Sequence, residues 1–265
     1  MKIKSKITLS LNDEEKVILS KTDSNEVFLY VDNKYKENDF IGFSSDQKGY
    51  YMISLDGGLQ ESFVYYTGGN FEFKIPFGEL LLGYNPMAFQ GSAHYIHSRV
   101  ASIDEIKCKK NLCKNTLDSH SNKQLFPHAV ANVETRNESV FFARNAIDGV
   151  IANNSHGDWP FVSWGVDQNP KAALTVEFNR EVVVDEIALY LRADFPHDSY
   201  WRSALITFSD GSKEQLNLSK THRKQSFKIQ ERVITSLTID SLIIDENETS
   251  PFPALIQIEA YGCEK

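Results

Sequence analysis

Residues 143–164 read ARNAIDGVIANNSHGDWPFVSW, and the prediction of the fold starts from this stretch. It contains an Asp-Gly turn, a run of amide and hydroxyl residues, a histidine, an acid and two tryptophans, with almost no hydrophobic periodicity. Loops of this length are uncommon in compact domains, and those that occur usually bind a ligand or cover a core. The sequence leaves both interpretations of this loop open.

The residues that follow this loop alternate as strands with one buried face do. Apolar residues occupy every second position in two runs, at Leu174, Val176 and Phe178 and at Ile187, Leu189 and Leu191. Asp210-Gly211 separates the apolar runs SALITF and KEQLNL, which is a strong hairpin signal. No segment keeps a helical period. We therefore predict an all-β structure here, with long loops at residues 143–164 and 192–203.

The first part of the chain alternates short apolar runs with turn residues from residue 6 to residue 99. Asp56-Gly57-Gly58 and Gly68-Gly69-Asn70 supply the positive φ angles of tight hairpins. This spacing predicts two β-sandwich domains, the first at residues 1–100 and the second at residues 129–265. Residues 101–128 are polar and aperiodic, and we expect them to connect the two domains and to lie along both.

Charge and composition exclude some classes of protein. The chain of 265 residues has a net charge of -8, which argues against a nucleic-acid-binding surface. No stretch of about eighteen apolar residues predicts a membrane span. The first residues lack a secretory signal, so we expect a cytoplasmic protein, or an extracellular one if the leader is missing from this sequence. Cys108 and Cys113 lack the spacing of a zinc site.

Several motifs occur in an order that resembles a known domain family. These are ARNAIDG, the tryptophan shortly after it, VEFNREVVVDEIALYL, SALITFSDGS, the glutamine before SFKI, and ALIQIEAYG. Residues 125–262 resemble the discoidin or coagulation-factor C-type domain, a galactose-binding-like jelly roll, and are similar to family 32 carbohydrate-binding modules. The N-terminal half resembles no family. The resemblance implies a module that binds a saccharide or glycan in loops at one end of the jelly roll.

The resemblance also implies a structural calcium ion near the Asp-Gly loop. By position, Asp148 and Glu259 match the acids that many members of the family place there. The chain departs from the pattern at Val150, where many members have asparagine, so one side-chain oxygen is missing and Asn153, Asn154 or Ser155 would have to replace it. Calcium takes six to eight oxygen ligands. The alternative is an Asx-turn, in which Asp148 binds its own backbone and Gly149 takes a positive φ.

Two loops carry the side chains that suit sugar recognition, which uses flat aromatic faces and planar polar groups. The loops span residues 156–164 and 192–202, and we expect them to meet at one end of the sandwich. The predicted ligand-binding residues are His156, Asp158, Trp159, Trp164, Arg192, Asp194, His197, Asp198 and Trp201.

Each of these residues also has a structural interpretation. Trp164 follows Phe161 and Val162 and suits a core, and Trp201 at the start of a strand suits a plug at the end of the sandwich. Arg192 would then brace its loop by an ion pair with Asp194 or Asp198. Trp159 is the tryptophan that we expect to be exposed.

The leading hypothesis is a non-catalytic carbohydrate-binding protein. An alternative is a protein-interaction module, including self-assembly into a homo-oligomer, that uses the same aromatic loops. A second alternative is a glycan-processing enzyme using Asp194, Asp198 and His197, because glycoside hydrolysis needs two carboxylates. No nucleophile elbow, P-loop or zinc-protease motif supports catalysis, so the enzyme ranks behind binding.

Overall fold

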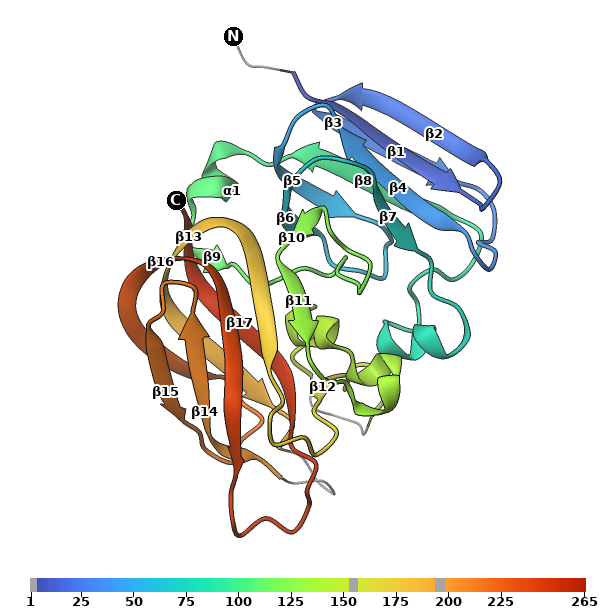
Figure 1. The fold of residues 1–265 in the computed structure, drawn as a ribbon. Helices are drawn as coiled ribbons and strands as arrows, with labels where there is room; N and C mark the ends of the chain where they lie inside the picture. Colours follow the sequence, from blue (N-terminus) through green and yellow to red (C-terminus); the bar gives the residue numbers. More distant parts are fainter. Residues whose placement is uncertain (1–3, 153–156, 194–198) are drawn as a thin grey trace.

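A computed structural model describes residues 4–152, 157–193 and 199–265. These residues form antiparallel sheets with a few short helices, which confirms the prediction of an all-β chain. Their buried apolar side chains form two clusters, one for each half of the chain. Figure 1 shows the two sets of sheets as separate layers joined by the green segment of the chain. Four predicted site residues, His156, Asp194, His197 and Asp198, lie outside the described residues.

The first half forms two sheets that face each other across the first cluster. One sheet has the order β2-β1-β4-β7, and the other has the order β10-β6-β5-β8-β3. Buried residues alternate with more exposed ones along β1, β3 and β6, as the sequence pattern predicts, whereas β2 at the edge of its sheet has no buried residue. The strands of the first sheet are β1 (Lys6–Asn12), β2 (Val17–Ser24), β4 (Phe40–Ser45) and β7 (Phe71–Lys74). Those of the second are β3 (Glu26–Val31), β5 (Gly49–Ser54), β6 (Ser62–Tyr66), β8 (His94–Val100) and β10 (Leu125–Phe126).

The second half forms one sheet of antiparallel strands that encloses the second cluster. Its order is β12-β17-β13-β16-β14-β15, with β11 beside β13 and β9 beside β17. The strands are β9 (Lys110–Asn111), β11 (His128–Ala131), β12 (Trp164–Gly165), β13 (Leu174–Leu191), β14 (Trp201–Phe208), β15 (Lys213–Asn217), β16 (Gln225–Ile244) and β17 (Ala254–Glu264). The hairpin predicted at Asp210-Gly211 joins β14 to β15, and Gly211 has a φ of 84°.

Two strands are longer than the sequence pattern predicts. The runs ALTVEF and VVVDEIALYL join into β13, and the three apolar runs of residues 225–244 join into β16. The two strands pair along most of their length, with a register shift between Glu177 and Val182. Asn179, with a φ of 50°, lies in that shift. Figure 1 shows both strands curving, so that one ribbon contributes to both sides of the same core.

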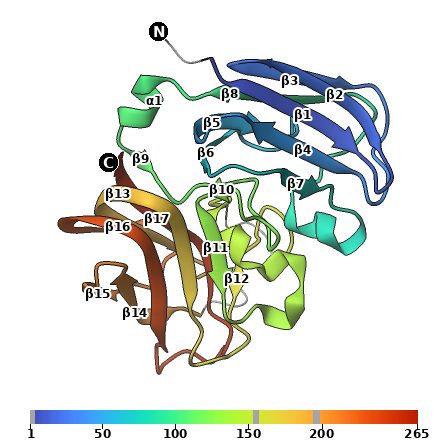
Figure 2. The same cartoon turned by 45° about the horizontal axis from the view of Figure 1, so that its top comes forward.

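The segment predicted as a connection contacts both halves. It contains α1 (Ile103–Lys107), β9, which pairs with β17, and β10, which pairs with β6. Figure 2 shows this segment running between the two sets of sheets. Three short 3-10 helices follow it, η2 (Thr135–Asn137), η3 (Ser139–Phe141) and η4 (Ala143–Ile147). Another, η1 (Gly78–Gly83), lies in the loop at residues 75–89. The boundaries at residues 100 and 128 stay a prediction.

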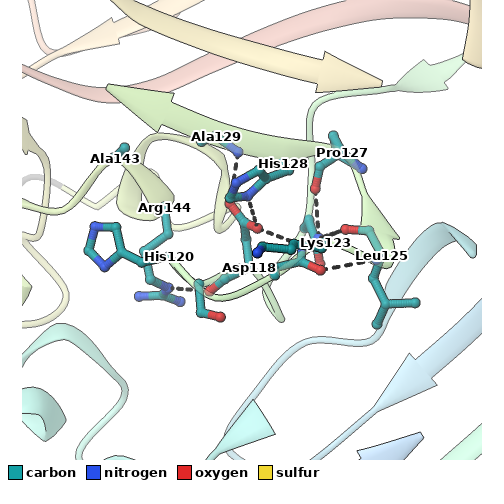
Figure 3. A network of polar contacts seen from close by, with 12 residues as sticks. Asp118, His120, Lys123, Leu125, Pro127, His128, Ala129, Ala143 and Arg144 are labelled. Carbon is teal, nitrogen blue, oxygen red and sulfur yellow. Dashed lines mark hydrogen bonds and ion pairs between the residues drawn. The ribbon is translucent and has the colours of Figure 1, made fainter. Parts of the chain in front are cut away.

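A network centred on Asp118 lies in this connecting region. The carboxylate is fully buried and accepts hydrogen bonds from His128 Nδ1 at 2.7 Å, from the Ala129 amide at 2.8 Å and from Asn122 Nδ2 at 2.8 Å. Arg144 Nε donates to the Asp118 carbonyl oxygen at 3.1 Å. Figure 3 shows His128, Ala129 and Arg144 around Asp118. The network therefore holds β11 and η4 against the connecting segment.

A second contact joins the halves at the turn inside β13. Arg180 donates to both carboxylate oxygens of Glu264 at 2.7 Å, and both side chains are almost completely buried. The Arg180 guanidinium also lies 5.6 Å from the ring centre of Tyr50 and 5.4 Å from that of Tyr65, and both tyrosines belong to the first half. A buried bidentate pair of this kind orders the turn and packs it on the neighbouring sheet.

No helix in the described part of the chain is long and apolar enough to cross a membrane.

Candidate ligand-binding site

A cavity of about 260 Å³ opens where β13 ends and β17 begins. Arg192, directly after β13, donates its backbone amide to the carbonyl oxygen of Ala254 at 2.9 Å, which holds these two strand ends together. Gly165 of β12 pairs with Ala254 on the other side. The cavity is lined by Thr135, Arg136, Phe141, Gly165, Val166, Asp167, Gln168, Arg192, Phe252, Pro253 and Ala254. Most of its lining is therefore on loops that the sheet positions, and we call it the Arg192 cavity.

Aromatic rings and guanidinium groups alternate in the wall of the Arg192 cavity. The guanidinium of Arg192 lies 4.5 Å from the ring centre of Phe161 and 5.9 Å from that of Phe141. Arg136 lies 5.3 Å from the ring centre of Phe141 and forms a bidentate pair with Glu138. Two guanidinium groups therefore lie within cation–π range of Phe141. Arg192 is only 5% exposed, so its planar donors are held in place.

The backbone around the Arg192 cavity adopts uncommon conformations. Arg136, Asp167 and Gln168 have φ angles of 50°, 47° and 56°, in a region that residues with side chains seldom occupy. Strain of this kind is concentrated at binding sites, where the surrounding structure fixes it. The Asp167 amide donates to Thr135 Oγ1 at 2.9 Å and so ties this turn to η2.

The lining of the Arg192 cavity suits binding of a small polar ring. Phe252 is 47% exposed and offers a flat apolar face, while Arg192, Gln168 and Asp167 offer planar donors and acceptors. The volume lies just below the ~300 Å³ at which pockets for drug-sized ligands begin, so one ring fits. Among its described lining residues, Asp167 is the one carboxylate, whereas glycoside hydrolysis uses two.

The structure places two of the predicted ligand-binding tryptophans in the core. Trp164 is fully buried and Trp201 is 1% exposed, and both belong to the cluster of the second half. Trp164 Nε1 donates to the Val133 carbonyl oxygen at 2.9 Å, so its polar atom is satisfied internally. This placement corrects their assignment to the ligand surface. The physical reason is that a large ring at a strand end gains more from burial in the sandwich than from exposure.

Asp158 and Trp159 lie away from the Arg192 cavity. Both line a separate groove of about 290 Å³ whose other wall is the loop around η1, including Leu81, Leu82 and Tyr84. Trp159 is half-buried there, between the two halves of the chain. The five members of the predicted cluster that the structure describes therefore separate into one residue at the cavity, two at this groove and two in the core.

The loop at residues 156–164 does approach Arg192, but through Phe161. This ring is fully buried under the Arg192 guanidinium. Sequence reasoning missed the other lining residues, Phe141, Arg136, Asp167, Gln168 and Phe252. Phe252 lies between Pro251 and Pro253, and an aromatic residue held by two prolines is a signal for an exposed ring. Phe141 lies beside Gly165 in the folded chain but 24 positions before it in sequence. No local sequence pattern therefore identifies Phe141 as a lining residue.

Of the residues near the Asp-Gly loop that the structure describes, the two predicted acids do not fit the calcium ion that the resemblance implies. Asn153, Asn154 and Ser155 lie outside the described residues. Asp148 is 4% exposed, and its Oδ1 accepts the Val150 amide at 2.8 Å, which is the Asx-turn weighed as the alternative. The same oxygen accepts Gln257 Nε2 at 2.8 Å. Burial raises the pKa of Asp148 to about 6, although the charge of Arg144 opposes this.

Glu259 is engaged separately. It forms an ion pair with Lys224 at 3.0 Å and accepts the Tyr261 hydroxyl at 3.0 Å. Within residues 4–152, 157–193 and 199–265 no three His, Cys, Asp or Glu side chains gather as metal ligands would. A hard cation needs several oxygens that are free of hydrogen-bond donors, and Asp148 and Glu259 do not supply them.

Comparison with known proteins matches no family model and no curated protein. Solved structures similar to this chain include sugar-binding modules. A chitosan-binding module of a chitosanase/glucanase from Paenibacillus sp. IK-5 is 16% identical, covers 58% of this chain and 100% of its own, and has a TM-score of 0.40. The family 32 module of NanJ from C. perfringens, in complex with galactose, is 13% identical. The match covers 58% of this chain and 99% of that module, with a TM-score of 0.41. The lectin domain of lectinolysin, complexed with Lewis B antigen, is 11% identical. The match covers 57% of this chain and 95% of that domain, with a TM-score of 0.42.

Proposed function

We propose that this protein is a non-catalytic carbohydrate-binding protein and that the Arg192 cavity holds one sugar ring. The observation that carries the proposal is the composition of that cavity. An exposed aromatic ring at Phe252 and the ring of Phe141 stand beside the planar polar groups of Arg192 and Gln168. Sugars present both an apolar C–H face and pairs of hydroxyls, and this combination matches both.

The backbone geometry supports a binding role for the same cavity. Three lining residues hold φ angles near 50°, and a cost of about 1–3 kcal/mol at each persists only where the surroundings enforce it. The motifs of residues 125–262, which resemble a sugar-binding family, are independent of this geometry. An isolated shallow site buries little area, so we expect dissociation constants in the micromolar to millimolar range.

The test is a saccharide titration of matched phenylalanine variants. Galactose, N-acetylgalactosamine, fucose and glucosamine are titrated by calorimetry against the native protein, Phe252→Ala and Phe28→Ala. Phe28 is the control because it is 48% exposed, nearly as much as Phe252, but lies on β3 of the first half. We expect Phe252→Ala to weaken binding of the saccharide that responds by about tenfold, through the loss of ring contact.

Equal loss in both variants, or binding that survives Phe252→Ala unchanged, would contradict the assignment of the cavity. A glycan array without any response from the native protein would contradict the function itself. Circular dichroism melting of each variant checks that the fold is retained.

A further inference from the structure

We propose that Gln257 takes the place of a structural cation against the Asp-Gly loop, so that this loop is held without a metal. The inference starts from the disagreement between the donor set near Asp148 and a calcium site. It concerns how the loop is held and does not rest on the proposed saccharide function.

The side-chain amide of Gln257 donates hydrogen bonds to oxygens of the Asp-Gly loop. Its Nε2 donates to the Asn145 carbonyl oxygen at 2.5 Å and to Asp148 Oδ1 at 2.8 Å. These are a backbone carbonyl and a carboxylate, the two kinds of oxygen that calcium takes from proteins. A neutral N–H group therefore occupies the position between them, where an ion would have to lie.

The other end of the amide adds a contact that a cation would not make. Gln257 Oε1 accepts the Gly149 amide at 3.0 Å. A backbone N–H directed to the centre of the cluster is repelled by a cation, whereas an amide oxygen accepts it. One side chain thus satisfies both a donor and acceptors of the loop, and it is only 1% exposed.

The neighbouring charges agree with a site that needs no ion. Burial of a carboxylate is costly unless hydrogen bonds surround it. Asp148 Oδ1 has two N–H donors, Val150 and Gln257, and Arg144 lies near enough to stabilise its charge. The Lys114 side chain passes over Gly149, where an added Cβ would lie 2.9 Å from Lys114 Cε. The charges of Arg144 and Lys114 both favour the ionised carboxylate.

The hydrogen bonds of Gln257 with the Asp-Gly loop lie close in sequence to residues of the Arg192 cavity. Gln257 lies on β17 three residues after Ala254, which lines the cavity. Its partners Asn145 and Asp148 belong to the segment that follows Phe141, another lining residue of the cavity. Gln257 therefore ties β17 to the segment that contains η4.

The experiment compares melting temperatures in chelator and in calcium. The native protein, Gln257→Glu, Asp148→Asn and Gln230→Glu are melted with excess EDTA and again with millimolar calcium chloride. Gln230 is the matched control because it is an exposed glutamine on β16. We expect the native protein and Gln230→Glu to melt at the same temperature in both buffers.

Gln257→Glu removes the N–H donors and adds a second buried carboxylate. We expect its melting temperature in EDTA to fall by roughly 5 °C or more. Calcium should restore most of this loss, because two carboxylates and the Asn145 carbonyl then form an oxygen set suited to calcium. Calorimetry should detect calcium binding by Gln257→Glu and none by the native protein.

Three results would overturn the proposal. One is a calcium-dependent rise in the native melting temperature that Asp148→Asn abolishes. Another is a Gln257→Glu protein as stable as the native one in EDTA, because the amide would then hold nothing. The third is a destabilised Gln257→Glu protein that calcium does not restore. None of these readouts uses a saccharide, so a failed sugar titration and a failed cation test are distinct outcomes.

Discussion

At the scale of the residue, Gly165 shows how closely the walls of the Arg192 cavity pack. A Cβ added at this position would lie 2.6 Å from Thr135 Oγ1 and 3.1 Å from Phe141 Cβ. Contacts this short force the neighbours to move, and both neighbours belong to the cavity. We predict that Gly165→Ala lowers the free energy of unfolding by about 1–3 kcal/mol, measured by urea denaturation.

Gly57 is the control for this substitution. A Cβ there meets nothing within 4 Å. Gly57→Ala should therefore change stability by less than about 0.5 kcal/mol. If the two variants were equally stable, the close approach of β12 to η2 and η3 would not be a real constraint on this position.

The tryptophans show why single residues were hard to place from sequence. Trp159, Trp164 and Trp201 have the same chemistry and all occur near predicted loops, yet the first is half-buried between the halves and the other two are in the core. Arg192 was predicted because its loop is dense in aromatic and planar polar residues. Its neighbour in space, Phe141, precedes it by fifty-one positions and carries no local signal.

At the scale of the element, the joining of predicted strands into β13 depends on one backbone angle. Asn179 has a φ of 50° in the register shift between Glu177 and Val182. Asparagine visits this region more readily than alanine, and glycine does so without a side-chain penalty. We predict that Asn179→Ala lowers the free energy of unfolding by about 1–2 kcal/mol, whereas Asn179→Gly is close to neutral.

Urea denaturation of both variants measures the difference. The comparison isolates the angle, because both substitutions remove the same amide group. Equal losses in the two variants would attribute the cost to the lost side chain and contradict the role of the backbone.

Periodicity predicted the faces of these strands but not their continuity. The alternation at Leu174, Val176 and Phe178 places the same residues in the core that the structure buries. It cannot tell a turn between two strands from a bulge within one. That choice depends on whether β16 continues alongside, which is a contact between residues far apart in the chain.

At the scale of the whole molecule, the Asp118 network in the connecting region makes stability depend on pH. Burial lowers the pKa of His128, but the hydrogen bond and the charge of Asp118 outweigh burial, so the pKa is raised overall. The folded protein therefore holds this proton more tightly than the unfolded chain, whose histidines titrate near ~6.5. The stabilisation is present below that pH and is lost as the pH rises through the raised value.

We predict that His128→Gln removes this part of the pH dependence. The free energy of unfolding of the native protein should fall more steeply than that of His128→Gln as the pH rises above about 6.5. Urea denaturation over a pH series measures both slopes. His222→Gln, an exposed position, serves as the control and should keep the native slope. Parallel native and His128→Gln curves would show that His128 gains no proton on folding.

By itself, the sequence determined the all-β class, the buried faces of the strands and the hairpin at Asp210-Gly211, because these depend on neighbours two to four positions apart. Only the tertiary structure decided where the tryptophans lie, which residues line the Arg192 cavity and how Gln257 reaches Asp148. These depend on strand ends and loops that are brought together from positions tens to more than a hundred residues apart, as in the contacts of Trp164 with Val133 and of Gln257 with Asp148. Burial and hydrogen bonding at such contacts select one arrangement among many that share the same local pattern.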